Sequence, residues 1–149
     1  METQKILKDL VSIDSQCTKS NKKIIDYIKE KLSEFEVKEF NFKKENLSLH
    51  NLIIKIPGIS SQSPLIFVGH TDTVSASESW TKNPFVPSEE NNKIYGLGSS
   101  DMKAGLACMI SAILSLDKKP NQDVYLLFDA DEEDGGTGAR AGGAREQRQ

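Results

Sequence analysis

The sequence predicts an α/β fold in which a mostly parallel or mixed sheet is flanked by helices. Two amphipathic helical segments come first, and a region with the two-residue period of β-strands follows them. Two short apolar runs, at residues 64–68 and 124–128, then enclose a third helical segment. The order strand, helix, strand implies a right-handed crossover and a parallel pairing of these two strands.

Each helix is predicted from apolar residues at a spacing of three or four. These residues are Ile6, Leu7, Leu10 and Val11 in the first helix, Ile24, Ile28 and Leu32 in the second, and Leu106, Met109, Ile110 and Ile113 in the third. Asn21 is a candidate N-cap for the second helix. The third helix is expected over residues 104–116, because Pro120 and Asn121 interrupt the pattern after it.

The strands are predicted from alternation and from β-branched residues. Residues 37–42 alternate, and residues 49–56 are rich in β-branched side chains. The run 64–68 is continuously apolar, which is typical of a buried central strand, and 124–128 is predicted to be a second buried strand. Residues 69–100 between them are expected to be irregular.

Composition limits the class of protein. A chain of 149 residues suits one domain, and its net charge of -3 gives no electrostatic footprint for nucleic acid or an anionic membrane. The chain has no run of 18 apolar residues and no signal-peptide pattern at its start. Cys17 and Cys108 could form one disulfide, but free thiols are the simpler interpretation. We therefore expect a cytoplasmic protein.

The last residues differ in composition from the rest. Residues 135–149 are rich in glycine, alanine and arginine and have no large apolar side chain. This tail is either the start of a helix or a disordered end. We accordingly divide the chain into residues 1–134 and the tail 135–149.

The first chemical motif is Gly-His-Thr-Asp-Thr-Val at residues 69–74, directly after an apolar strand. In open α/β sheets, ligands bind beyond the carboxyl ends of strands. His70 could present one ring nitrogen to a metal while Asp72 holds the other ring N–H. The alternative is a core histidine that is hydrogen-bonded at a strand end.

The second motif is Asp-Ala-Asp-Glu-Glu-Asp at residues 129–134, directly after the other apolar strand. Such acidic runs usually form a solvated face. Like charges at a strand end are costly unless cations are present. Adjacent glutamates on a turn could divide the work, one binding a metal and the other moving protons.

The third motif surrounds Asp101, where the third helix is about to begin. The alternative role for this residue is an N-cap. The glycines at 96 and 98 do not complete a phosphate-binding loop, and Gly-x-Gly-x-x-Ala at residues 136–141 fits the dinucleotide pattern only loosely. Together, the three motifs give one imidazole and several carboxylates, a donor set suited to Zn²⁺ or Co²⁺.

These motifs, in this order, resemble those of the zinc-dependent aminoacylase and carboxypeptidase superfamily. The resemblance covers the histidine motif at 69–74, Trp80 with Pro84 and Phe85, Tyr-Gly-Leu-Gly-Ser-Ser-Asp-Met-Lys at 95–103, and Asp-Glu-Glu at 131–133 before a glycine pair. Within the superfamily the acetylornithine deacetylases look most similar, since the desuccinylases more often have Arg at the position of Leu97.

The resemblance implies a site with two Zn²⁺ ions, with Co²⁺ as an alternative metal. His70 and Glu133 would be metal ligands, Asp101 would bridge the two ions, Asp72 would orient His70, and Glu132 would be the general base. A cis peptide bond after Asp101 is also implied. The substrate would be an N-acyl amino acid, and the full-length protein would be a homodimer.

The chain departs from the superfamily in length. Members insert a second domain and supply two further ligands, an acid and a late histidine, but no histidine follows His70 here. We therefore expect an N-terminal fragment that is inactive alone. The alternatives are a non-catalytic remnant, a module that binds a divalent cation through the acidic turn, and, with the least support, a nucleotide-binding protein.

Overall fold

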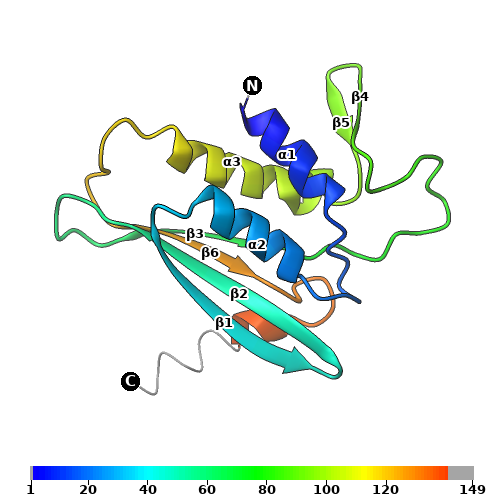
Figure 1. Cartoon of the computed structure of the whole chain (residues 1–149), viewed down its shortest axis with the longest axis horizontal. Helices are drawn as coiled ribbons and strands as arrows, with labels where there is room; N and C mark the ends of the chain where they lie inside the picture. The colour runs from blue at the N-terminus through cyan, green and yellow to red at the C-terminus, as the bar shows by residue number, and fades with distance from the viewer. Residues whose placement is uncertain (1, 141–149) are drawn as a thin grey trace.

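Two helices form at the N-terminus, where apolar residues recur at helical spacing (Figure 1). They are α1 (Glu2–Ser12) and α2 (Lys22–Lys31). The computed structural model describes residues 2–140. The buried side chains of the two helices are Ile6, Leu10 and Val11 in α1 and Ile24, Ile25 and Ile28 in α2. Both helices were predicted from these apolar positions, and both predictions are confirmed.

Asn21 precedes α2 but does not cap it with its side chain. Its amide donates to the carbonyl of His50 at 2.7 Å and to the hydroxyl of Thr71 at 2.9 Å. Its side-chain oxygen accepts the backbone N–H of His50 at 2.9 Å. Asn21 therefore occupies the predicted N-cap position, but its side chain joins the start of α2 to the sheet instead of capping the helix.

Four strands form one mixed sheet in the order β1-β2-β6-β3. They are β1 (Glu36–Lys44), β2 (Leu47–Ile56), β3 (Leu65–His70) and β6 (Val124–Asp129). β2 is antiparallel to both β1 and β6, and β3 is parallel to β6. Helix α3 (Ala104–Leu114) lies between the parallel strands in the sequence and ends two residues earlier than expected. The predicted mixed sheet and the predicted parallel pair are both confirmed.

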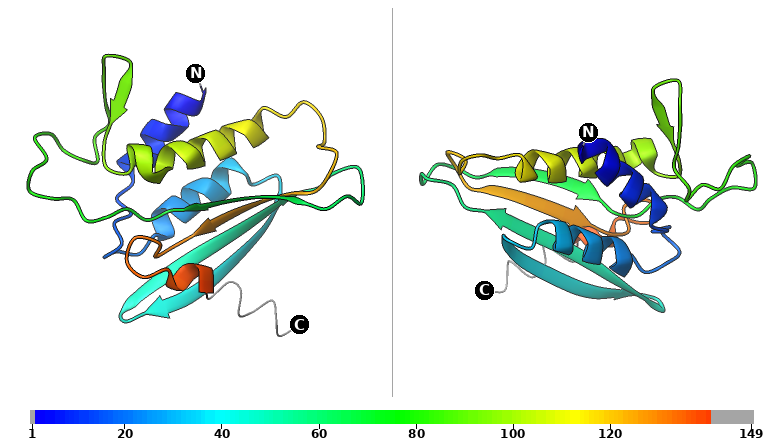
Figure 2. Two further views of the ribbon diagram at one scale, coloured as in Figure 1. Left: turned by 180° about the vertical axis from the view of Figure 1, so that it is seen from behind. Right: turned by 45° about the horizontal axis from the view of Figure 1, so that its top comes forward.

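The three helices pack on one face of the sheet (Figure 2). The core unites their apolar residues with alternate residues of two central strands, namely Leu52, Ile54 and Ile56 of β2 and Val124, Leu126 and Phe128 of β6. Because alternate residues of a strand point to opposite faces, all six of these side chains point toward the helices. The intervening residues of β2 and β6, such as Ile53 and Leu127, point to the other face, which we call the back face.

The position predicted for β3 is wrong, because the strand lies at the edge of the sheet and is not buried. Within residues 2–140, β3 pairs with β6 alone, so its other edge has no strand beside it. Ile66 and Val68 are 53% and 57% exposed, and Leu65 and Phe67 are 45% and 43% exposed. A continuously apolar run predicts a strand that is packed on both faces. Among residues 2–140, the neighbours of β3 bury only part of its surface.

The segment predicted to be irregular, 69–100, contains a small hairpin that projects away from the sheet (Figure 1). Its strands are β4 (Ser88–Glu90) and β5 (Lys93–Tyr95). Asn91 and Asn92 connect them with φ angles of 51° and 60°. Asparagine tolerates this left-handed conformation, so the Asn-Asn pair was the available signal for a turn. The short helix η1 (Ser99–Lys103) then leads into α3.

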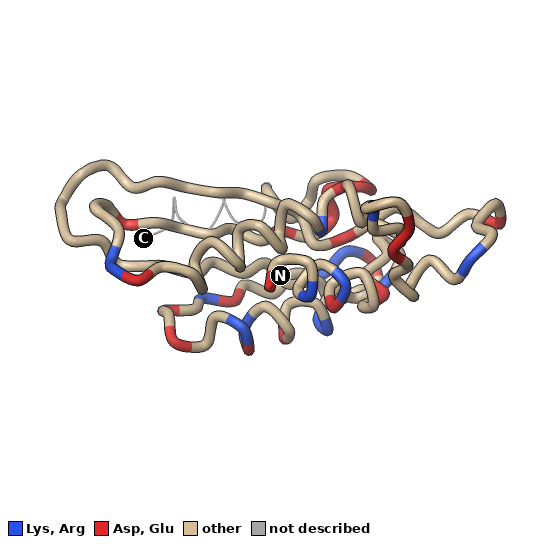
Figure 3. Tube along the Cα trace, turned by 90° about the horizontal axis from the view of Figure 1, so that it is seen from above, with Lys and Arg blue, Asp and Glu red and all other residues tan. Residues whose placement is uncertain are grey.

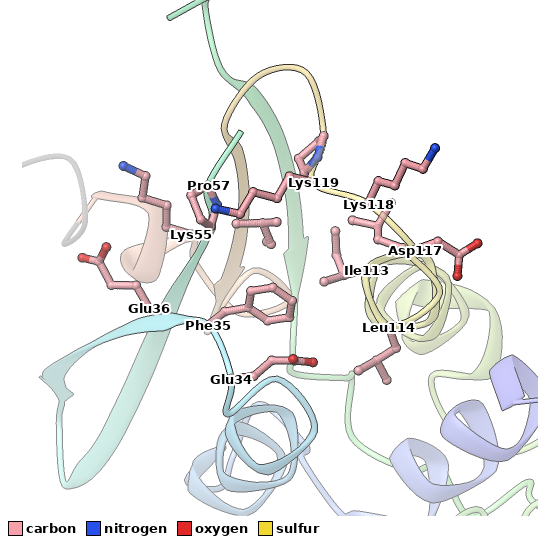
Figure 4. A pocket seen from close by; sticks show the side chains of 13 residues that line it. Glu34, Phe35, Glu36, Lys55, Pro57, Ile113, Leu114, Asp117, Lys118 and Lys119 are labelled. Atoms are coloured by element: carbon pink, nitrogen blue, oxygen red, sulfur yellow. The ribbon is translucent and has the colours of Figure 1, made fainter. Parts of the chain in front are cut away.

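A cavity of about 500 Å³ lies away from the carboxyl ends of β3 and β6 and opens near the start of β6. Phe35 and Ile113 line it, and Lys118 and Lys119 lie at its rim (Figure 4).

Basic and acidic residues are interspersed along the chain (Figure 3). Within residues 2–140, no helix has the length and apolar content that a membrane span needs.

Two sequence predictions concern thiols and the tail. Both cysteines are free thiols, as the simpler interpretation predicted. Residues 137–140, within the predicted tail, are helical, which agrees with the start of a helix at this point. The remainder of the tail, residues 141–149, lies outside the described residues.

The exposed edge of β3 predicts self-association of the chain, since an apolar unpaired strand is a template for further pairing. Ile66→Lys should lower the apparent mass of the concentrated chain in light scattering, with little loss of stability because this side chain is half exposed. Ile59→Lys is the matched control, since Ile59 is 70% exposed but lies outside the sheet. Equal masses for the two variants would contradict the prediction that chains associate through the unpaired edge of β3.

Candidate metal centre

The parallel strands β3 and β6 bring two motifs to the same end of the sheet, where both strands finish. His70 is the last residue of β3, and its partner in the register is Asp129, the last residue of β6. Thr71, the residue after β3, links the ends of the two strands. Its N–H and its hydroxyl both donate to the carbonyl of Asp129, at 2.8 and 2.9 Å. The acidic residues 129–134, which we call the acidic loop, therefore begin beside His70.

His70 is buried, with 7% of its surface exposed, and its ring is oriented by the main chain. Nδ1 lies 3.0 Å from the carbonyl oxygen of Asp72. A carbonyl can only accept, so Nδ1 carries a proton, and whenever the ring is neutral Nε2 holds the lone pair. The expected contact with the carboxylate of Asp72 is not formed, because that oxygen lies 3.8 Å from Nδ1.

The carboxylate of Asp72 instead holds the acidic loop. One oxygen accepts the backbone N–H of Glu132 at 3.2 Å, and the other accepts that of Glu133 at 3.0 Å. The Asp72 side chain is 4% exposed, so these two bonds are shielded from water. Asp72 thus orients the imidazole through its carbonyl and both glutamates through its side chain, a double role that the sequence spacing did not reveal.

The structure groups three of the predicted site residues closely. Donor atoms of His70, Glu132 and Glu133 all lie within 4.8 Å of one another. Asp101 joins the group through His70, since its carboxylate is 3.1 Å from Nε2. The Asp101 side chain is 78% exposed, unlike that of His70, and therefore faces the open side of the cluster.

Asp101 does not act as the N-cap that the sequence left open. Helix α3 begins at Ala104 and Lys103 occupies its N-cap position, so Asp101 lies two residues too early in the chain. The peptide bond between Asp101 and Met102 is cis, as the resemblance implied. The residue thus lies in the turn before α3, with its carboxylate directed to the imidazole.

The donor atoms fit a metal ion better than they fit one another. The lone pair of Nε2 faces the carboxylate of Asp101 at 3.1 Å and that of Glu132 at 3.9 Å. A lone pair directed at carboxylates is repulsive unless a proton or a cation lies between them. A neutral imidazole and several carboxylates form a set of ligands that Zn²⁺ accepts. His70, Glu132 and Glu133, with Asp101 beside them, therefore make a chemically suitable metal site.

The electrostatics of the cluster agree with a site that needs a positive charge. Burial alone would lower the pKa of His70, but the hydrogen bond to Asp101, the Asp72 carbonyl and the nearby negative charges together raise it. Burial raises the pKa of Glu133, and the charges of Asp101, Glu132 and Asp72 raise it further. The pKa of Asp129 is raised by burial and by the charges of Asp72 and Glu132.

The acidic loop is not a wholly solvated face, which was the alternative interpretation. The side chain of Asp131 is fully buried and forms an ion pair with Lys44, whereas that of Asp134 is 61% exposed. Lys44 and Asn51, from the β1–β2 hairpin, contact this loop and were not among the predicted site residues. Lys44 is 87 residues from Asp131 and Asn51 is 79 residues from Ala130, so no local pattern could have indicated them.

One glycine of the loose dinucleotide pattern, Gly138, does not border open space in the described structure. A Cβ atom on Gly138 would lie 2.0 Å from the carbonyl oxygen of Ala130. Gly138 is therefore packed against the acidic loop itself, which explains why this position is glycine. The last residue of the loose dinucleotide pattern, at 141, lies outside the described residues.

Comparisons with known proteins match this chain to a family model and to curated relatives. Residues 66–148 match the model of the peptidase family M20/M25/M40. The acetylornithine deacetylase of Buchnera aphidicola (subspecies Acyrthosiphon pisum, strain APS) is 35% identical over 145 residues, which are 94% of this chain and 38% of that protein. The succinyl-diaminopimelate desuccinylase of Sulfurimonas denitrificans is 33% identical over 138 residues, with 92% of this chain and 36% of that protein covered.

A solved structure supports the fold. The crystal structure of human carnosine dipeptidase 1 matches with a TM-score of 0.82 at 18% identity, and the match covers 99% of this chain and 36% of that one. At this identity the match shows the arrangement of helices and strands alone. The chain spans about two fifths of the length of the curated relatives that it matches.

Asp72 gives the first test of the site. Asp72→Ala should weaken Zn²⁺ binding by about 10–100-fold, the usual effect of losing a group that positions metal ligands. The expected cause is the release of the two glutamate amides that this carboxylate holds. Isothermal titration of the purified chain with Zn²⁺ measures the effect, and Asp117→Ala, which removes an acid from the loop before β6, is the control. Equal affinities for both variants would show that the Asp72 carboxylate does not hold the two glutamates in place for metal binding.

Proposed function

The chain belongs to the peptidase family M20/M25/M40, and from this membership we propose that it takes part in metal-dependent hydrolysis of the amide bond of an N-acyl amino acid. The observation that carries the proposal is the grouping of His70, Glu132 and Glu133 where β3 and β6 end. The proposed substrate class is that of the acetylornithine deacetylases, since several proteins of that name are 35–39% identical over most of this chain.

The proposed metal is Zn²⁺, with Co²⁺ as the alternative, and two ions are expected in the complete site. His70 and Glu133 would hold metal, and Asp101 would bridge the two ions. When bound, Zn²⁺ supplies Lewis acidity that polarises a carbonyl group and makes water more acidic. An imidazole and two carboxylates are suitable donors for this borderline cation.

The roles of the protein groups follow from their positions. Glu132 is proposed to be the general base, since its side chain is 57% exposed and its carboxylate lies 3.9 Å from the ring of His70. It would accept a proton from water and return that proton to the leaving amine. Asp72 would keep the imidazole in one orientation through its carbonyl, and would keep both glutamates in place through its carboxylate.

The described residues supply part of the proposed site. A zinc ion usually takes four ligands, so two ions require more groups than His70, Asp101, Glu132 and Glu133 provide. We therefore propose that residues 1–134 are the N-terminal part of a catalytic domain and that the 149-residue chain alone does not turn over substrate. A cytoplasmic location and a homodimer of the whole protein complete the proposal.

Two other functions have observations in their favour. Succinyl-diaminopimelate desuccinylase activity is supported by a relative of that name at 33% identity. Against it stands Leu97, at a position where the desuccinylases more often have Arg. A cation-binding module without catalysis is supported by the same cluster of donor atoms, because that cluster needs a positive charge whether or not a reaction takes place.

The two glutamates should separate in a metal-binding experiment. Glu133→Ala should weaken Zn²⁺ binding by more than the roughly 10–100-fold typical of groups that only position ligands, because a ligand itself is lost. Glu132→Ala should keep most of the affinity, since its proposed work is proton transfer. Competition with a chromophoric chelator gives both constants. If Glu133→Ala left the affinity unchanged, its assignment as a ligand would be wrong.

Substrate preference distinguishes the candidate functions. The whole protein that contains these residues, loaded with Zn²⁺, should hydrolyse N-acetylornithine faster than N-succinyl-diaminopimelate. Glu132→Ala should abolish the reaction while the metal is retained. Chromatographic separation of each substrate from its deacylated product measures both rates. Faster release from the succinyl substrate would favour the second candidate, and no release from any N-acyl amino acid would favour the cation-binding module.

A further inference from the structure

Lys44 lies at the end of β1, far from the acidic loop in sequence but next to it in the structure. The loop that follows β6 passes beside the β1–β2 hairpin (Figure 2). The ammonium group of Lys44 donates to the carboxylate of Asp131, to the carbonyl of Asp134 at 2.5 Å and to the carboxylate of Asp134 at 2.8 Å. One side chain thus holds both ends of the Asp131–Asp134 turn.

The partner of Lys44 is an anchor inside the loop. The Asp131 side chain is fully buried, and the φ angle of this residue is 69°. Its carboxylate also accepts the N–H of Thr137 at 3.1 Å, and its carbonyl accepts the N–H of Gly136 at 2.5 Å. A buried carboxylate is costly without a positive partner, so the conformation of this turn depends on Lys44.

A second residue of the same hairpin supports the base of the loop. Asn51 of β2 accepts the N–H of Ala130 at 3.1 Å and donates to the carbonyl of Gly138 at 2.8 Å. Asn51 therefore joins the two ends of the segment 130–138, while Lys44 holds its middle. The candidate ligands at 132 and 133 lie between these fixed points, with Asp72 holding their amides from the other side.

The charges of the loop explain why a lysine is suited to this position. Hydrogen bonds to Asp131 and Asp134 raise the pKa of Lys44, so the side chain stays cationic. It pairs with Asp131 and Asp134 and leaves Glu132 and Glu133 without an ion pair to any lysine or arginine among residues 2–140. The carboxylates of these two glutamates then remain available to the imidazole, although the loop contains five acids.

We propose that Lys44 is a positioning residue that holds the acidic loop in the conformation in which Glu132 and Glu133 face His70. The consequence for metal binding rests on the function proposed above, whereas the ordering of the loop does not. Lys44 itself touches neither His70 nor the two glutamates, and it acts through Asp131 and Asp134.

The chain offers a matched control. Lys43 is adjacent and exposed, and it has no ion pair with another residue of the range 2–140. Because neighbours on a strand point to opposite faces, its side chain is directed away from the acidic loop. Lys43→Met and Lys44→Met remove the same charge from the same hairpin. Lys44→Arg keeps a cation that can pair with carboxylates and should restore the function of the lysine.

The first measurement is amide hydrogen exchange of the metal-free chain. Lys44→Met should speed the exchange of the Gly136 and Thr137 amides by at least about tenfold, because the anchor that accepts them is released. The Leu126 amide of β6 should change little, which separates a local effect from general destabilisation. Lys43→Met and Lys44→Arg should resemble the wild type. If Lys44→Met matches Lys43→Met at Gly136 and Thr137, the proposal is overturned.

The second measurement is the Zn²⁺ affinity of the same variants. Lys44→Met should weaken binding by about 10–100-fold, and Lys43→Met should not. Faster exchange with unchanged affinity would show that Lys44 orders the loop without positioning ligands, which also overturns the proposal. If the wild-type chain binds no Zn²⁺, the proposed metal site fails in every variant alike, and the exchange rates alone decide whether Lys44 holds the loop.

Discussion

The parallel pairing of β3 with β6 is the constraint on which the rest of the site depends. With this pairing, both strands finish at the same end of the sheet, and His70 lies opposite Asp129. The histidine motif and the acidic loop, which are about sixty residues apart in the sequence, therefore begin within one residue pair of each other. The crossover through α3 makes this parallel pairing possible, because it returns the chain to the starting edge. The same crossover brings Asp101 to the imidazole, immediately before α3 begins.

Concentrating carboxylates at one strand edge creates a repulsion that each part of the surrounding structure reduces in a different way. Asp72 is satisfied by the amides of Glu132 and Glu133, and Asp131 by Lys44 and the amide of Thr137. The acids that remain without such partners are the ones that face His70. This division separates acids that shape the site from acids available to a cation, and the spacing of the acids in the sequence alone does not make that distinction.

The sequence predicts those parts of the structure that depend on local periodicity. Apolar spacing located α1, α2 and α3, and the strand–helix–strand order gave the parallel pair. The edge position of β3 could not be predicted, because its apolar run describes the cover that the strand needs and not the number of strands beside it. Asp72 was expected to hold the imidazole because it is two residues away, but the loop amides lie closer to its carboxylate. Lys44 and Asn51 were missed because their partners in the acidic loop are 79 to 90 residues distant.

The back face of the sheet connects the stability of the fold to the geometry of the site. Near the strand ends, this face is covered by residues 138 and 139, which enclose a cavity of about 290 Å³ with Phe40, Ile53, Val68 and Leu127. Gly138 reaches this position only because it has no side chain, and Asn51 fixes it there. The segment that covers the apolar face is thus the continuation of the segment that presents Glu132 and Glu133. Contacts that lie well outside the cluster of donor atoms, on β1 and β2, can therefore set the positions of those atoms.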